Sequence, residues 1–138
     1  MKGKTMNNER IAFIHPYNPD SDEQPLLVFE CEELPFIVDF HFKVFMINLK
    51  HDEPYYIQSQ LFRVTDSNQT EVCDKKGFWM KTEDTQGKPD DIAASIRLSF
   101  LKSMFSYEGT YFVRTGILVN NEEIDGNEAY FKVSLVNE

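Results

Sequence analysis

Residues 36–49 read FIVDFHFKVFMINL, and this stretch decides the fold class. Hydrophobic side chains alternate with Asp39, His41 and Lys43, which is the period-two pattern of a strand that buries one face. After Val44 the parity changes, and Phe45, Ile47 and Leu49 become the apolar set. Because such a change of parity would turn the buried face toward solvent, the pattern predicts either a β-bulge or a crossing between sheets near Val44–Phe45.

Strand patterns continue on both sides of this stretch. Short runs of β-branched and aromatic residues are separated by clusters of Asn, Asp, Gly and Pro, which form turns. Asn120 and Asn121 suit a hairpin turn, because asparagine tolerates a positive φ angle. The expected strands cover residues 26–31, 55–64, 77–80, 112–119 and 129–136.

The stretch 92–105 is compatible with two structures. Ile92, Ile96 and Phe100 have the spacing of one helical face. Leu98 also alternates with polar neighbours on either side, and β-branched or aromatic residues are frequent. These features favour a strand over residues 95–101, with a helix as the alternative.

The strand pattern as a whole predicts the fold class. About seven to eight short strands, with turns every 8–15 residues or so, are typical of an all-β, two-sheet immunoglobulin-like sandwich of antiparallel strands. The chain of 138 residues has the size of one domain. We therefore expect a single domain over residues 1–138, in which residues 1–9 are flexible.

The C-terminal third carries a resemblance to a known class of proteins. Gly109-Thr110-Tyr111, followed by a hairpin and then by Phe131 and Val133, resembles the last two strands of immunoglobulin-like sandwiches. The chain is similar, mainly over residues 36–136, to small bacterial immunoglobulin-like β-sandwich proteins of unknown function. The resemblance implies a tyrosine corner, in which the phenol of Tyr111 bonds to nearby backbone. It implies no catalytic residue, and the Cys–Trp–Cys pattern of antibody domains is not present.

Composition excludes several classes of function. The chain has 14 Lys and Arg against 23 Asp and Glu, for a net charge of −9, and 41% of its residues are hydrophobic. A nucleic-acid-binding module needs clustered basic residues, and a disordered chain lacks this much hydrophobic material. No apolar stretch has the length of a signal sequence or a membrane span. We expect a cytoplasmic protein in which Cys31 and Cys73 are reduced.

Catalytic and metal sites are not predicted. The acidic turns 18–23 and 125–128 offer oxygen ligands for Ca²⁺, but neither matches a calcium-binding loop, so solvated turns are the preferred interpretation. Cys73 has Lys75 and Lys76 nearby, which would lower a thiol pKa, but no motif supplies a base. We expect no enzyme activity and no cofactor.

The preferred functional hypothesis is a non-enzymatic protein-interaction module. Sandwiches expose sheet edges with unpaired backbone groups, which invite a second strand. The segment 36–49 is the candidate, with Asp39, His41 and Lys43 as the surface residues. The expected partner is another protein or a second copy of the chain, paired through a sheet edge, and neither nucleic acid nor a membrane.

The alternative hypothesis is a domain that binds a small ligand, either a carbohydrate or Ca²⁺. Tyr55, Tyr56, Phe78 and Trp79 are the candidate platform for a sugar ring. The competing interpretation places Phe78 and Trp79 in the core, because large aromatic side chains dominate sandwich interiors. The exposure of Trp79 distinguishes the two.

Overall fold

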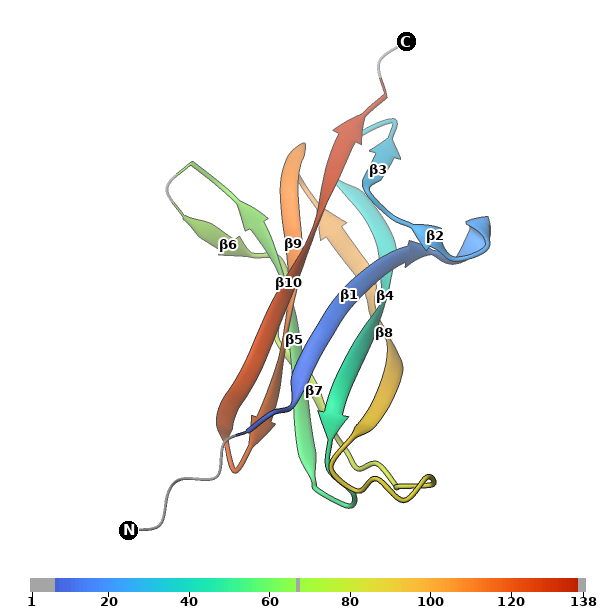
Figure 1. Ribbon diagram of the computed structural model, residues 1–138. Coiled ribbons are helices and arrows are strands. Elements are labelled where there is room, and N and C mark those ends of the chain that lie inside the picture. Colours follow the sequence, from blue (N-terminus) through green and yellow to red (C-terminus); the bar gives the residue numbers. More distant parts are fainter. Residues whose placement is uncertain (1–6, 67, 137–138) are drawn as a thin grey trace.

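The strands form two sheets that lie face to face (Figure 1). The structure is a computed structural model and describes residues 7–66 and 68–136. Sheet A has the strand order β2-β1-β4-β8. Sheet B has the order β3-β10-β9-β5-β6, and β7 also pairs with β5. The elements are β1 (Arg10–Asn18), the 3₁₀ turn η1 (Pro19–Ser21), β2 (Gln24–Pro25), β3 (Val28–Cys31), β4 (Phe36–Leu49), β5 (Tyr55–Val64), β6 (Gln69–Glu71), β7 (Lys76–Met80), β8 (Ile92–Phe105), β9 (Gly109–Val119) and β10 (Glu122–Leu135).

The topology is that of an immunoglobulin-like sandwich. The N-terminal part of the chain serves both sheets, because β1 pairs with β4 in sheet A whereas β3 pairs with β10 in sheet B. The β3–β10 pair is parallel, and the other strand pairs are antiparallel. Seven of the ten strands in the described residues have five residues or more. The predicted two-sheet fold is confirmed.

The predicted tyrosine corner is present at the start of β9. The Tyr111 hydroxyl donates a hydrogen bond of 2.7 Å to the carbonyl oxygen of Tyr107, and only 1% of Tyr111 is exposed. The turn between β9 and β10 also follows the prediction, since Asn120 and Asn121 have φ angles of 51° and 65°. Both features fix the connections around β9, the central strand of sheet B.

The strand β4 supplies the centre of the core but does not bend where its sequence suggests. Met46 continues the inward set, and the register shift against β8 falls between Met46 and Leu49, where Asn48 has a φ of 61°. Phe45 stays on the outer face and stacks on Phe13 with 4.4 Å between ring centroids. The predicted bulge of β4 is present, but it lies at Ile47–Asn48 and not at Val44–Phe45; beside Phe45 the extra residue belongs to β1, between Ile11 and Phe13. Phe45 suggested an earlier change of parity because it is hydrophobic, although it lies on the outer face, where it stacks on Phe13.

The stretch 92–105 is a strand, as preferred from its alternation. The spacing of Ile92, Ile96 and Phe100 also fits a strand, because residues four apart share one face of a strand. Farther along, Leu101 and Lys102 of β8 lie opposite the single residue Asp39 of β4. Lys102 has a φ of 54°, and its backbone N–H donates to the Asp39 carboxylate at 2.8 Å. This bulge shifts the side-chain pattern within β8.

A buried polar link joins the N-terminal residues to the core. The Tyr55 hydroxyl donates to Glu9 Oε2 at 2.7 Å and accepts from the backbone N–H of Lys50 at 2.9 Å. Glu9 is 1% exposed and Tyr55 is fully buried, and burial raises the pKa of Tyr55. Of the segment 1–9 expected to be flexible, residues 1–6 lie outside the described part, whereas Glu9 is packed inside the domain.

Candidate functional site

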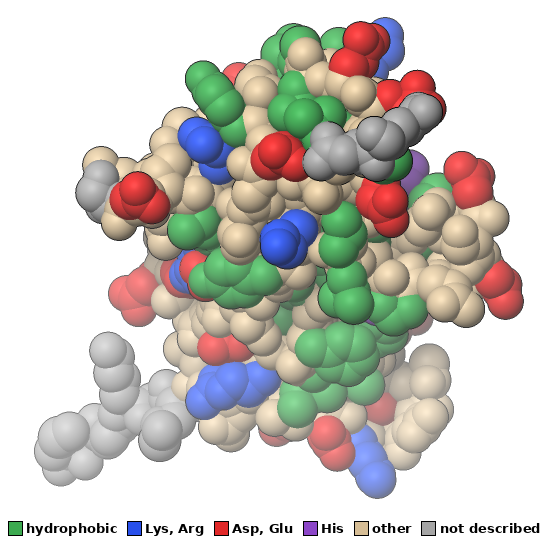
Figure 2. Space-filling view, turned by 90° about the horizontal axis from the view of Figure 1, so that it is seen from above, with side chains coloured by type: hydrophobic (Ala, Val, Ile, Leu, Met, Phe, Trp, Pro, Cys, Tyr) green, Lys and Arg blue, Asp and Glu red, His purple; other side chains and the backbone are tan. Residues whose placement is uncertain are grey.

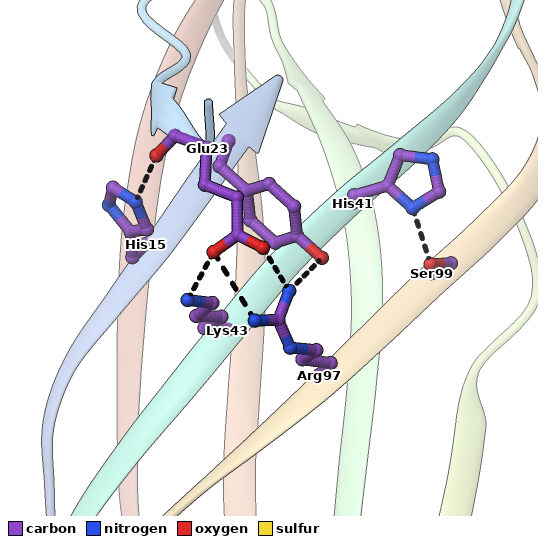
Figure 3. A network of polar contacts seen from close by, with 7 residues as sticks. His15, Glu23, His41, Lys43, Arg97 and Ser99 are labelled. Carbon is purple, nitrogen blue, oxygen red and sulfur yellow. Dashed lines mark hydrogen bonds and ion pairs between the residues drawn. The ribbon is translucent and has the colours of Figure 1, made fainter. Parts of the chain in front are cut away.

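The outer face of sheet A carries a polar network centred on Glu23 (Figure 3). Glu23 follows η1, and its carboxylate lies 2.5 Å from Lys43 Nζ of β4 and 2.5 Å from Arg97 Nη1 of β8. Hydrogen bonds from Arg97 and then from Lys43 lower the pKa of Glu23 from 4.5 to about 2. The network therefore fastens the connection between β1 and β2 to the two neighbouring strands.

The predicted interaction residues lie on this face, but not at a sheet edge. The strand β4 is paired with β1 on one side and with β8 on the other, so its backbone is not open to another strand. The prediction of segment 36–49 as a sheet edge is wrong, because pairing order is a long-range property. Each predicted side chain already has a partner within the protein. Asp39 accepts a hydrogen bond from the Lys102 backbone N–H, His41 Nδ1 is hydrogen-bonded to Ser99 Oγ at 2.6 Å, and Lys43 forms an ion pair with Glu23.

The long open edge belongs to β8. Within the described residues β8 pairs only with β4, and its other side faces the chain that enters β7. A groove of about 380 Å³ runs there, between the segment 72–76 and the second half of β8. We call it the β8 groove. Its lining residues are Val72, Cys73, Asp74, Lys75, Lys76, Phe100, Leu101, Lys102, Ser103 and Met104.

Hydrophobic and basic side chains share the β8 groove. Leu101 is 63% exposed and Met104 is 52% exposed. Three lysines line the groove against one aspartate, although the chain as a whole is acidic. Seen from the end at which β8 runs into β9, the surface shows hydrophobic areas separated by charged side chains (Figure 2). Such a mixture suits a partner that brings both apolar and acidic groups.

The Cys73 thiol in this groove is not activated. Burial raises its pKa, and this effect is larger than the lowering by Lys76. The lysines nearby in sequence therefore do not make a nucleophile of it. Cys31 is 5% exposed in the core, as expected from its apolar strand.

The four predicted platform residues divide between the two faces of sheet B. Tyr55 and Phe78 point inward, where Tyr55 is fully buried and Phe78 packs against the core. Tyr56 and Trp79 lie opposite each other on the outer face, with 5.1 Å between ring centroids. Trp79 is 63% exposed, so the competing prediction of a core tryptophan is wrong, and so is the inclusion of Tyr55 and Phe78 in the platform. Successive residues of a strand cannot share a face.

Beside this aromatic pair the outer face of sheet B is hollowed. A hollow of about 350 Å³ opens over β5 and β9. Gly116 of β9 pairs directly with Gly126 of β10, and the Arg114 and Glu123 side chains lie across the two glycines, joined by an ion pair of 2.6 Å. A Cβ atom on either glycine would collide with them. We call this the sheet B hollow, and it is lined by Gln58, Ser59, Gln60, Phe62, Glu71, Lys75, Arg114, Gly116 and Glu123.

The sheet B hollow was not predicted from the sequence. Its signal was the presence of two glycines within otherwise regular strands, which marks a close approach of another group. The glycines face each other only because of the β9–β10 register, which the residues alone do not give.

The two acidic turns have structural roles. Asn18 Oδ1 accepts from the Asp20 backbone N–H at 2.9 Å and so caps η1. The Asp125 carboxylate accepts from the Ile11 backbone N–H at 2.7 Å, which links β10 to β1. Across residues 7–66 and 68–136, no three His, Cys, Asp or Glu side chains are grouped to hold a metal ion. No helix in that part of the chain is long and apolar enough to cross a membrane.

Several solved structures resemble this chain in fold, at low sequence identity. No family model and no curated protein matches the chain. Among solved structures, a candidate beta-galactosidase from Bacteroides fragilis is 11% identical with a TM-score of 0.61, over 91% of this chain and 17% of its own. A glycosyl hydrolase family 2 member from Bacteroides cellulosilyticus is 12% identical with a TM-score of 0.56, over 92% and 16%. An immunoglobulin-like protein from Pseudomonas aeruginosa is 15% identical with a TM-score of 0.43, over 94% and 99%. The chain thus spans less than a fifth of the two glycoside-hydrolase-related structures.

Proposed function

We propose that the protein is a non-enzymatic interaction module that binds an extended, acidic segment of a partner protein along β8. The main support for this proposal is the open edge of this 14-residue strand, with the β8 groove beside it. A strand added to an edge gains backbone hydrogen bonds, and neighbouring pockets select its side chains. Leu101 and Met104 offer the apolar contacts, since both are more than half exposed.

Charge supports an acidic partner rather than a second copy. The charged residues of β8 are Arg97 and Lys102, both basic. Arg97 is paired with Glu23, but antiparallel pairing of two β8 edges would bring the Lys102 side chains of both copies into one interface with no acidic residue of β8 to offset them. An acidic strand would instead meet Lys75, Lys76 and Lys102. Pairing of two copies through β8 is therefore less favourable electrostatically than pairing with an acidic strand of another protein.

Two further features of the β8 groove favour binding over catalysis, and the state of the cysteines favours the cytoplasm. The one thiol of the β8 groove has a raised pKa, so it is a poor nucleophile. No histidine lines the groove to act as a base. Both cysteines are free, which suits the reducing cytoplasm as the place of the interaction.

A site-specific photo-crosslinker tests this proposal. Placed at Leu101 in living cells, it should join the protein to one acidic, extended segment, identified by mass spectrometry. The matched control is Leu27, which is 69% exposed and precedes β3 in the other sheet. The double variant K76E/K102E should abolish the crosslink. Equal crosslinking at both positions, survival of the crosslink in the double variant, or a crosslink to a second copy would contradict the proposal.

A further inference from the structure

We infer that the outer face of sheet B binds a neutral saccharide, with its ring against Tyr56 and Trp79 and its hydroxyl groups toward the sheet B hollow. This site lies on the outer face of sheet B and not along the β8 edge, and Lys75 is the residue that lines both. It rests on three observations: the exposed aromatic pair, the glycines around Gln58 and the balanced charge of the hollow.

The aromatic pair forms an open corner. The rings of Tyr56 and Trp79 are tilted by 59°, so they enclose a shallow angle rather than stacking face to face. Gly77 makes this arrangement possible, because a Cβ atom there would collide with the Tyr56 phenol, which lies across the strand. An indole that is 63% exposed in such a setting has a large apolar face free for a ligand.

Gln58 joins the aromatic corner to the sheet B hollow. It lies two residues along β5 from Tyr56 and therefore shares the outer face. Its neighbour is Gly77 on the β7 side and Gly116 on the β9 side. Neither glycine adds a side chain of its own beside the amide; the Tyr56 phenol lies over Gly77 and the Glu123 carboxylate lies over Gly116. A ligand that rests on the two rings can then reach Gln58, Arg114 and Glu123.

The polar groups of the hollow select the class of ligand. Its charged lining residues are two basic ones, Lys75 and Arg114, and two acidic ones, Glu71 and Glu123. An anion or a cation would meet as much repulsion as attraction, so a neutral ligand fits best. A sugar ring presents C–H groups to aromatic faces and hydroxyl groups to amides, guanidinium and carboxylates. A volume of about 350 Å³ lies within the range of small-molecule sites.

The chain provides its own reporter for the experiment. Trp79 is the single tryptophan of the sequence, so intrinsic tryptophan fluorescence reports from this site alone. The probes are glucose-, xylose-, mannose- and galactose-based neutral oligosaccharides at millimolar concentration. One of them should change the emission saturably, and Q58A should weaken its binding at least about tenfold, a loss of about 1.4 kcal/mol. The matched control is Y107A, which removes an aromatic that is 58% exposed beside Arg63.

Three outcomes would overturn the inference. The first is unchanged emission with all the neutral oligosaccharides. The second is a response to acidic oligosaccharides or nucleotides alone. The third is equal weakening in Q58A and Y107A. Thermal unfolding and circular dichroism of Q58A separate a lost site from a lost fold. The variant K76E/K102E changes no residue that lines the sheet B hollow and should keep a response to the saccharide, and Q58A should keep the Leu101 crosslink, so each proposal can fail without the other.

Discussion

The outer faces of the two sheets are built from the same kind of regular strand, yet one is closed and the other is open. On sheet A, outward side chains pair with one another across strands, through the Glu23 network and the stack of Phe13 on Phe45. On sheet B, Gly116 and Gly126 have no side chains of their own and are crossed by Arg114 and Glu123, a hollow of about 350 Å³ lies beside them, and Trp79 is 63% exposed. The comparison teaches that charged residues on a strand can mark a surface satisfied by its own sheet. Glycines within the strands and an exposed aromatic side chain are the better marks of a hollowed surface.

The largest expected effect separates the two faces of β5. Tyr55→Ala should destabilise the protein by about 3–5 kcal/mol, since it empties a fully buried site and removes the hydrogen bond to Glu9. Tyr56→Ala, one residue away, should cost about 1 kcal/mol or less. Urea unfolding of both variants measures the difference. Similar losses would mean that the outer face of sheet B is packed rather than open.

Closing the hollow is the next test. Gly116→Ala places a methyl group where the Glu123 carboxylate lies, so this side chain must move away from Arg114. We expect a change in stability of about 1 kcal/mol or less, because the displaced groups are flexible and at the surface. Saccharide binding should weaken at least about tenfold, which titration of Trp79 fluorescence reads directly. A variant that binds as the parent does would show that the hollow takes no part in recognition.

The closed face should respond to acid. Because the folded-state pKa of Glu23 is depressed to about 2, its network contributes stability above the ordinary value of 4.5 and loses it as the pH falls toward 2. Melting temperatures of the parent and of Glu23→Gln should therefore differ at pH 6 and converge near pH 2. High salt should shrink the difference. A gap that stays constant over this range would assign the effect to packing instead of charge.

The smallest effect concerns Trp79. Trp79→Ala should change the free energy of unfolding by about 0.5 kcal/mol or less, because the side chain is mostly in solvent. Phe78→Ala should cost clearly more, since Phe78 packs against the core. The comparison is made by thermal and chemical unfolding. A large loss in Trp79→Ala would remove the basis for an exposed aromatic corner.

Much of the fold is readable from local periodicity. Alternation places strands at 36–49 and 55–64 and decides 92–105 correctly, and Tyr111 after Gly109 indicates its corner. Local patterns fail where a partner on another strand sets the outcome. The hydrophobic side chain of Phe45 suggests a core position. It lies instead on the outer face, where it is covered by Phe13, and this contact could not be predicted because the two residues are distant in sequence.

The candidate sites were less predictable for the same reason. Which strand has an open edge depends on the order of pairing, and this order makes β8 the edge instead of β4. The sheet B hollow depends on a register that sets Gly116 against Gly126. Neither the composition nor the hydrophobic periodicity of the sequence gives the order of the strands or the register between β9 and β10.

The parallel pairing of β3 with β10 has a mechanical consequence. A tension applied to the start of β3 and the end of β10 pulls two strands of the same direction past each other. The bonds from Lys132 N–H to the Leu27 carbonyl and from Val136 N–H to the Cys31 carbonyl bracket this contact, each at 2.8 Å. They and the bonds between them bear the load together, in shear, rather than opening one by one. A strand of four residues thus acts as a clamp between the early and late parts of the described chain.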